Sequence, residues 1–416
     1  RRLYPICRSI TGNGVRKTLR MLAERAPLQL HELPSGTSVF DWTVPPEWNI
    51  NAAILKDPQG RIVADFSQHN LHVLNYSVPV KKRMPLSELR PHLYSLPDYP
   101  DWIPYLTSYY KENWGFCLSH RVLERLPEGE YQVEIDSTLA PGQLTYADCF
   151  LPGQTDDEIL LSCYVCHPSM CNDSLSGVVL LAELAAYYQS HGPQRYGLRF
   201  VFVPETIGAL CWLFQNEAGL SRIKHGLVAT CLGDPGPSTY KRTRHGDLEL
   251  DRVVEKVLVE SKEPFSICDF IPDGSDERQY SSPGFNLPIG SLMRTPYANF
   301  PQYHTSADDL KFMSADALGN TFGKYVKIIE MLCANRRMLN LNPRGEPQLG
   351  RRGLYSLLGS QKEENCGITS ALLWVLNFSD GIHTLVDIAR RSKLPFADVR
   401  SAADALVACQ LLRELD

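Results

Sequence analysis

The sequence predicts an α/β protein with a mostly parallel central sheet, a small β-rich insertion and a C-terminal winged helix. Three observations support this fold class. From residue 157 to about residue 339, apolar runs such as EILLSCYV and LRFVFVP alternate with helical segments, a pattern typical of a buried parallel sheet covered by helices. Residues 31–105 are rich in proline, glycine, tryptophan and β-branched residues. Residues 346–416 contain three short helical patterns joined by tight turns.

The elements follow in this order along the chain. GVRKTLRMLAERA, near the N-terminus, has the apolar spacing of a helix. We assign residues 1–30, together with 106–342, to the α/β domain, and 31–105 to an inserted β-rich domain with a turn at DPQG. Within the α/β domain, strands are expected at EILLSCYV, LRFVFVP, GLVATCLG and PIGSLM. The segments ITSALLWVLNF, HTLVDIARRS and FADVRSAADALVACQLL give the winged helix at 346–416.

Composition excludes several classes of partner. The formal net charge is -5 over 416 residues, which gives no electrostatic reason to expect nucleic acid or an anionic membrane as partner. No stretch approaches the roughly 18 apolar residues of a membrane span. The opening RRLYPICRSITGNG has no signal-peptide apolar region, and 12 scattered cysteines do not suit a disulfide scaffold. We therefore expect a cytoplasmic protein.

The C-terminal helices are balanced in charge. Residues 351–416 carry eight basic and eight acidic side chains, whereas a winged helix that grips DNA needs a basic excess. This balance favours a module for packing or protein interaction over a nucleic-acid reader. A protein partner or a homo-oligomer formed through the insertion or the winged helix fits the same pattern.

The stretch CYVCHPSMCNDSLSG, residues 163–177, is open to several interpretations. CYVCH matches a c-type haem attachment motif, and its CxxC also suits a redox pair or half of a zinc ribbon. The haem interpretation conflicts with a buried strand end in a chain without an export signal, and no second CxxC completes a ribbon. The alternative is that the cysteines are apolar filler and that His167 and Asp173 carry the chemistry.

Polar residues follow four of the predicted strands. Sites in open α/β sheets gather at the carboxyl ends of strands, so residues that follow different strands are expected to meet. Histidine nitrogens and carboxylate oxygens are the ligands and the base that a hydrolytic zinc site requires. The residues in these positions are His167, Asp173, Glu205, Asp234, Arg294 and His304.

Five motifs in order resemble those of the M28 zinc aminopeptidases. DSLSGVVLLAELA is similar to the D-[DN]-x-S-G helix element, VFVPETIGAL to the strand before E-E-x-G-L, and CLGD to a strand that ends in a ligand aspartate. SDERQYSSPGFNLPIGSL is similar to the SDH…F…GIP segment, and YHTSADDL to the closing H-T-x-x-D motif. The whole layout, including YPICRSITGNGVR, is similar to aminopeptidase-like proteins with DUF4910 and DUF2172 domains. The resemblance implies a zinc-aminopeptidase (phosphorylase/hydrolase-like) fold.

The resemblance also implies roles for individual residues. His167, Asp173, Asp234 and His304 would be metal ligands, with Asp173 the carboxylate that bridges two metals in M28 enzymes. Glu205 would be the general base, which takes a proton from activated water and hands it to the leaving amine.

The chain departs from the M28 pattern at Thr206, where those enzymes carry a second glutamate. A neutral hydroxyl is a poor zinc ligand. Three possibilities stay open: one zinc, which we favour; two metals with a substitute ligand; or loss of peptidase activity.

We expect a zinc-dependent hydrolase of the aminopeptidase type that cleaves an amide bond next to a free amine. Its substrate would be a small peptide or an aminoacyl or amino-sugar compound. Tyr303 and Arg294 are the candidates for contact with the substrate, although a surface salt bridge explains Arg294 equally well. The alternatives are a single-zinc acyl or cyclising transferase, or a non-catalytic protein that binds a ligand or regulates through the winged helix.

Overall fold

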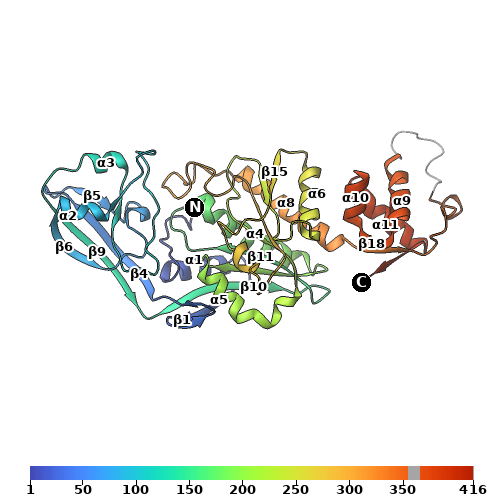
Figure 1. The fold of residues 1–416 in the computed structure, drawn as a ribbon, viewed down its shortest axis with the longest axis horizontal. Coiled ribbons are helices and arrows are strands. Elements are labelled where there is room, and N and C mark those ends of the chain that lie inside the picture. Colours follow the sequence, from blue (N-terminus) through green and yellow to red (C-terminus); the bar gives the residue numbers. More distant parts are fainter. Residues whose placement is uncertain (355–365, 416) are drawn as a thin grey trace. The chain divides into compact units, whose positions relative to one another are not determined.

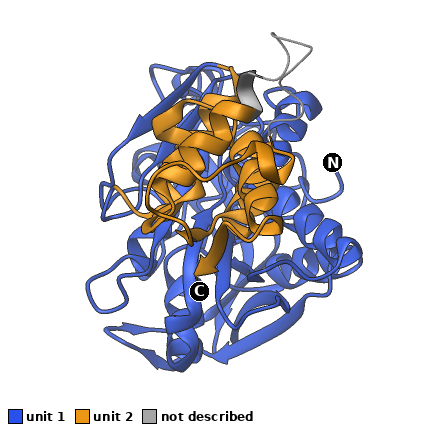
Figure 2. Cartoon of the chain, turned by 90° about the vertical axis from the view of Figure 1, so that its right-hand side faces the viewer, with its two compact units in different colours: residues 1–246, 264–323 blue, residues 247–263, 324–416 orange. Residues whose placement is uncertain are grey.

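The structure is a computed structural model that describes residues 1–354 and 366–415, and these form two compact units (Figure 2). Unit 1 comprises residues 1–246 and 264–323, and unit 2 comprises 247–263 and the chain from 324 onward. Residues 355–365 and 416, which belong to the expected winged-helix segment, lie outside the described residues.

The core of unit 1 is an eight-stranded sheet of order β1-β10-β12-β11-β13-β16-β14-β15. Figure 1 labels β1, β10, β11 and β15 of this sheet. Its four central strands run parallel, and every residue of β11 is buried. The bounds are β1 (Gln29–Pro34), β10 (Gln143–Leu151), β11 (Glu158–Tyr164), β12 (Gly197–Val203), β13 (Ile223–Val228), β14 (Ser238–Lys241), β15 (Phe265–Cys268) and β16 (Ile289–Met293). Helices α1 (Asn13–Ala23), α4 (Ser176–His191) and α5 (Ile207–Asn216) pack on it. The mostly parallel α/β fold expected from the sequence is therefore confirmed.

A second sheet forms the insertion. It is antiparallel, with the order β5 (Ile62–Asp65), β4 (Glu47–Lys56), β9 (Glu130–Ala140) and β6 (Val80–Pro85). The strand pairing differs from the expected limits of 31–105: β1 pairs with β10 in the central sheet, and β9 belongs to the inserted sheet. The physical reason is that β9 alternates, burying Tyr131, Val133 and Ile135 in a core that is separate from that of the central sheet.

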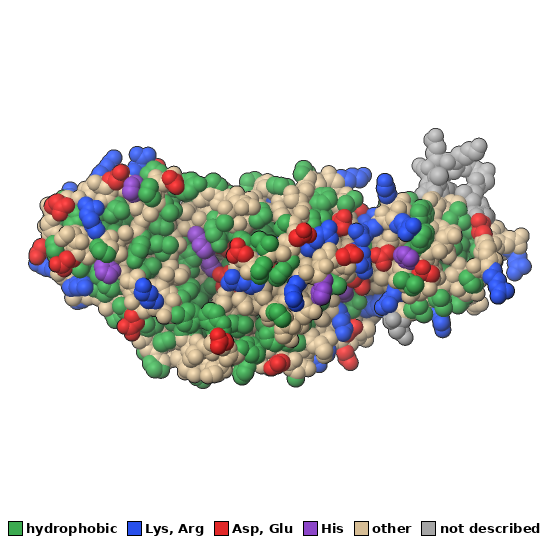
Figure 3. Space-filling view, viewed as in Figure 1, with side chains coloured by type: hydrophobic (Ala, Val, Ile, Leu, Met, Phe, Trp, Pro, Cys, Tyr) green, Lys and Arg blue, Asp and Glu red, His purple; other side chains and the backbone are tan. Residues whose placement is uncertain are grey.

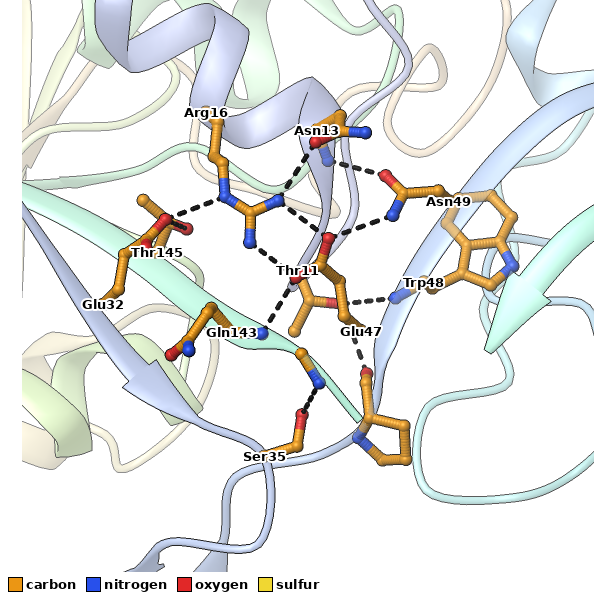
Figure 4. Close-up of polar contacts among 12 residues, drawn as sticks. Thr11, Asn13, Arg16, Glu32, Ser35, Glu47, Trp48, Asn49, Gln143 and Thr145 are labelled. Carbon is orange, nitrogen blue, oxygen red and sulfur yellow. Dashed lines mark hydrogen bonds and ion pairs between the residues drawn. The ribbon is translucent and has the colours of Figure 1, made fainter. Parts of the chain in front are cut away.

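A charged cluster joins helix α1 to both sheets (Figure 4). Arg16 of α1 donates to Glu32 of β1 and, through two nitrogens, to Glu47 at the start of β4. Glu47 also accepts from the backbone N–H of Gln143, where β10 begins. The hydrogen bond from Arg16 is the largest cause that lowers the pKa of Glu47 to about 2. This network fixes the point at which the chain enters and leaves the insertion.

The C-terminal part of unit 2 combines short helices with a small antiparallel sheet. The helices are α9 (Cys366–Phe378), α10 (Leu385–Ser392) and α11 (Phe396–Ala408), and the strands, in the order β18-β17-β19, are Asp380–Thr384, Arg337–Asn340 and Leu412–Leu415. Unit 2 also takes in α6 (Glu249–Ser261) and the end of α8 (Ala315–Ala334), which were expected in the α/β domain alone. The buried Lys256 of α6 donates to the carbonyl oxygens of Ala389 and Leu394, so α6 and the winged helix form one body.

None of the described helices combines the length and the apolar character needed to cross a membrane.

Candidate metal centre

Three residues expected as metal ligands converge at the carboxyl end of the central sheet. His167 follows β11, Asp173 lies in the turn before α4, and His304 lies in the loop after β16. The Asp173 Oδ2 atom is 3.0 Å from His304 Nε2 and 4.0 Å from His167 Nε2. One ligand atom from each of the three residues lies within 4.8 Å of the others. Tetrahedral zinc with bonds of about 2.0–2.2 Å separates its ligand atoms by roughly 3.3–3.6 Å, and the observed 3.0 and 4.0 Å lie just below and just above that range.

Two atoms of the cluster have no other use. Asp173 Oδ2 and His304 Nε2 are buried and contact each other at 3.0 Å, and neither has a further hydrogen-bond partner among the described residues. Buried polar atoms are rarely left without a partner, because the loss of water then goes uncompensated. Their convergence with His167 is what a cation would satisfy, so the residues present fit a zinc ion.

The electrostatics of the cluster favour ligands in their binding forms. Burial lowers the pKa of His167 to about 4, which keeps its imidazole neutral. Burial opposes ionisation of Asp173, but the neighbouring His167 and His304 outweigh it and lower the pKa of Asp173 to about 2. A neutral imidazole and an ionised carboxylate are the forms that bind metal.

Asp308 and Arg8 hold the loops that carry the cluster. The Asp308 carboxylate accepts the backbone N–H groups of Cys171, Asn172 and Asp173 at 3.2, 2.6 and 2.9 Å. Arg8, from the N-terminal segment, is 1% exposed and donates from Nε to the carbonyl oxygen of His167 at 2.9 Å. The peptide bond between Asp173 and Ser174 is cis. Arg8 therefore holds the loop that carries His167, and Asp308 holds the turn that carries Asp173.

Glu205 stands beside the cluster. It follows β12, its side chain is 25% exposed, and its Oε2 lies 3.8 Å from His167 Nε2. Burial raises the pKa of Glu205 well above its usual range, and the carboxylates of Asp276 and Asp173 add to the rise. Asp276 itself is buried, with a pKa raised to about 7 by burial, and it accepts the backbone N–H of Thr206 at 2.7 Å. A carboxyl group with a raised pKa next to a candidate metal position has the properties of a general base.

Cys166 lies close to the cluster as well. Cys166, His167 and Glu205 form a second group of possible ligand atoms. The Cys166 sulfur, however, accepts the backbone N–H of Glu205 and lies 3.3 Å from His167 Nδ1. Burial raises the pKa of the Cys166 thiol well above its usual range, so it stays protonated. Cys166 therefore orients the imidazole from its Nδ1 side and leaves Nε2 to face Asp173.

The structure does not bring Asp234 to the cluster. Its carboxylate accepts from Asn172 Nδ2, from the backbone N–H of Gly236, and from both the N–H and the hydroxyl of Thr295. The expectation failed because β13 ends at Val228, so the chain has already turned away at residue 234.

Thr230 faces the cluster from the end of β13 instead. Its hydroxyl lies 2.6 Å from the hydroxyl of Tyr164, and both contact Asp173 Oδ1. Sequence patterns missed these two residues, because a tyrosine and a threonine in apolar strand ends carry no metal-site signature. Thr230 does lie within the CLGD-containing run, so the strand end was identified and only the register was wrong.

A cavity of about 570 Å³ opens beside Glu205. The two expected substrate contacts differ in their placement. Tyr303 stacks on His304 with ring centroids 3.9 Å apart, so it borders the cluster. Arg294 does not line the cavity, because its side chain is bonded to Asn320 of α8. The cation that lines the cavity is Arg278, four residues into the SDERQ stretch.

Comparisons with known proteins place this architecture in a family. Residues 1–335 match the model of a domain of unknown function, DUF4910, and residues 336–414 match a winged helix-turn-helix model, HTH_47. A Clostridium acetobutylicum protein is 52% identical over 411 residues, covering 99% of this chain and 94% of that one. Its name assigns it, provisionally, to polysaccharide biosynthesis and gives it an aminopeptidase-like domain.

Solved structures agree. A crystal structure of a protein from Clostridium acetobutylicum, provisionally named a peptidase, superposes with a TM-score of 0.93 at 51% identity and covers 100% of this chain and 94% of its own. A zinc aminopeptidase of Bacillus subtilis gives a TM-score of 0.55 at 12% identity over 78% of this chain and 90% of its own. An M28 peptidase precursor of Shewanella amazonensis SB2B gives 0.55 at 12% identity over 80% and 90%. The last two likenesses concern the fold, which is that of the M28 zinc aminopeptidases. The chain belongs to the DUF4910 family and ends in a winged helix.

Proposed function

We propose that the protein is a zinc-dependent hydrolase of the aminopeptidase type, which cleaves an amide bond next to a free amine. One zinc ion would be held by His167, Asp173 and His304, and Glu205 would act as the base. The observation that carries this proposal is the pair of buried atoms Asp173 Oδ2 and His304 Nε2, which face each other 3.0 Å apart beside Glu205 and have no further hydrogen-bond partner among the described residues.

One ion is favoured over two by the surroundings of Asp173. A carboxylate that bridges two metals uses both oxygens, but Asp173 Oδ1 is already engaged by the hydroxyls of Tyr164 and Thr230. The position of the second glutamate in M28 enzymes is held by Thr206, whose hydroxyl accepts from the Arg278 guanidinium at 3.2 Å. Neutral hydroxyls and a cation therefore stand where a second ion would need carboxylates.

The residues of the chain would share the chemistry as follows. When bound, zinc would supply an acidified water molecule and polarise the scissile carbonyl. Glu205 takes a proton from the attacking water as the new C–O bond forms, and delivers it to the amine nitrogen as the C–N bond breaks. Burial, and after it the charge of Asp276, keeps the pKa of the Glu205 carboxyl raised, so that Glu205 takes up the proton readily. Tyr303 and Tyr105 pack on the His304 ring and restrict water around it.

The hydroxyls around Asp173 Oδ1 and at Thr206 also support a second function. Without carboxylates for a second metal ion, the site suits a single-zinc enzyme that transfers or cyclises an acyl group, or a protein that only binds its ligand. The retained Glu205 argues for catalysis, since ligand binding alone does not need a base beside the metal.

Zinc analysis of the purified protein, combined with hydrolysis of aminoacyl amides by the wild type and by Glu205→Gln, tests the proposal. We expect bound zinc in both proteins and turnover in the wild type alone. Absence of zinc, or equal turnover by the two proteins, would contradict it.

The substrate class we propose is a small peptide or an aminoacyl or amino-sugar compound. An amino-sugar amide would agree with the polysaccharide assignment in the name of the Clostridium relative. The described cysteines are all free, as is usual for proteins in a reducing compartment. We therefore propose that the protein is located in the cytoplasm.

The winged helix is proposed to serve packing or protein contacts rather than nucleic acid. In a helix-turn-helix, the N-terminal residues of the second helix read the bases. The corresponding N-terminus here is that of α11, where the backbone N–H of Phe396 donates to Glu260 of α6 at 2.7 Å. On the face shown in Figure 3, basic and acidic side chains are interspersed, in keeping with the net charge of -5. Self-association through the insertion or the winged helix is a further possibility that sedimentation would test.

A further inference from the structure

Arg278 is a cation at the wall of the cavity that forms no ion pair with any residue the structure describes. It comes from the short helix α7 (Glu277–Tyr280), is half-buried, and lines the cavity together with Glu205 and Thr206. Its one hydrogen bond within residues 1–354 and 366–415 goes to the Thr206 hydroxyl, and its buried Nε has no partner among them. Neither Glu205 nor Asp276 forms an ion pair with it, although both carboxyl groups feel its charge. A half-buried guanidinium of this kind is costly unless an anion completes it.

Apart from Gln279, the rest of the cavity wall is mostly apolar and aromatic. Ile10, Tyr109, Tyr110 and Trp42 belong to it, and the rings of Trp42 and Tyr110 meet edge to face with centroids 5.4 Å apart. Both residues are partly exposed, at 39% for Trp42 and 51% for Tyr110. Two neighbouring aromatic rings that face water are a surface on which an apolar ligand group can pack. The cavity thus offers one cationic point beside the base and an apolar surface next to it.

We infer that the leaving part of the substrate is an amino acid with a free carboxylate, which Arg278 binds, and an apolar side chain, which packs on Trp42 and Tyr110. This inference rests on the proposed amide hydrolysis and deepens it. In an aminoacyl amino acid, the carboxylate is three bonds from the scissile carbonyl carbon. Arg278 lies near the base, since it donates a hydrogen bond to Thr206, the residue that follows Glu205. The guanidinium fork matches a carboxylate through two hydrogen bonds, which a neutral amide does not reproduce.

The central experiment compares alanyl-phenylalanine with alanyl-phenylalanine amide, which differ only in the carboxylate. For the zinc-loaded wild type, we expect kcat/KM for the acid to exceed that for the amide by about 10- to 100-fold, mostly through KM. In Arg278→Gln this preference should fall to near one, because hydrolysis of the acid falls much more than hydrolysis of the amide. A merely structural role for Arg278, or one that acts only on the pKa of Glu205, would lower both substrates equally and would overturn the inference.

Arg294→Gln is the matched control, since Arg294 is also half-buried but is bonded to Asn320 away from the cavity. It should keep the preference for the acid. Thermal denaturation and zinc content of each variant show that it is folded and loaded. Arg278→Lys, which keeps a point charge without the fork, should recover part of the preference.

A binding measurement separates this inference from the proposed function. Calorimetric titration of zinc-loaded Glu205→Gln with N-acetyl-phenylalanine and with its amide reports recognition without turnover. Tighter binding of the acid, lost in Glu205→Gln/Arg278→Gln, supports the inference even if no hydrolysis is found with the wild type. Equal binding of the two compounds, or binding of neither, would overturn it even if aminoacyl amides are hydrolysed.

Discussion

Replacing Tyr164 with phenylalanine removes the hydroxyl that engages Asp173 Oδ1 and leaves the metal-facing Oδ2 in place. Tyr164 is 3% exposed and also lies 2.6 Å from the Thr230 hydroxyl, so water has little access to replace the lost group. A hydrogen bond to an ionised acceptor contributes about 1.5–3 kcal/mol. Loss of a side chain that hydrogen-bonds a metal ligand typically lowers the affinity for the metal by about 10- to 100-fold. We therefore expect the Kd for zinc to rise by that factor in Tyr164→Phe.

Competition for zinc against a chromophoric chelator measures this change. The matched control is Tyr280→Phe, which removes an equally buried tyrosine hydroxyl, bonded to Ser162 at 2.8 Å, without touching Asp173. Its zinc affinity should stay within about twofold of the wild type. An unchanged Kd in Tyr164→Phe, or an equal loss in Tyr280→Phe, would refute the idea that Tyr164 positions the ligand.

Three further predictions concern the base, the pH dependence of stability and the packing under the site. Glu205→Gln should keep its zinc but lose at least about 100-fold in kcat on an aminoacyl amide, measured by release of the amine. Burial lowers the pKa of His225 to about 4, whereas the pKa of an unfolded histidine is near 6.5. The contribution of His225 to the free energy of unfolding is therefore undiminished above pH 6.5 and is lost progressively as the pH falls toward 4. Between pH 7 and pH 5, the free energy of unfolding measured in urea should fall by about 2 kcal/mol less in His225→Phe than in the wild type. The same pH dependence in both proteins would contradict this. Gly177→Ala places a Cβ 2.0 Å from the carbonyl oxygen of Ala229 and should lower the free energy of unfolding by about 2–3 kcal/mol, whereas Gly319→Ala, with nothing within 4 Å, should raise it slightly.

Much of the fold could be predicted because its signals are local. Strands such as EILLSCYV are apolar throughout, and this follows directly from burial on both faces. The limits of the insertion were harder to predict, because β9 pairs with a strand about 80 residues earlier in the chain. The alternating pattern of β9 indicates a half-buried strand, but it does not say which of two sheets covers it. The shared packing of α6 with the winged helix depends likewise on contacts distant in sequence, such as those of Lys256.

The candidate site divides in a similar way. His167, Asp173 and His304 stand in motifs that are recognisable by residue type and spacing, and the structure brings them together. Asp234 has the right residue type at nearly the right place, yet an error of a few residues past the end of a strand sends a side chain elsewhere. Nothing in the sequence apart from its place after an Asp-Glu pair marked Arg278 as a site residue. Which side chains line a cavity depends on the folded structure, so this position could not be predicted.

The number of zinc ions per chain tests the central claim most directly. The measurement is elemental analysis of the protein after saturation with zinc and removal of the excess, for the wild type and for His304→Ala. A single site made of His167, Asp173 and His304, with Asp173 Oδ1 engaged by Tyr164, predicts one zinc per wild-type chain and much less than one in His304→Ala. Two ions per wild-type chain, or one ion that persists in His304→Ala, would contradict the account.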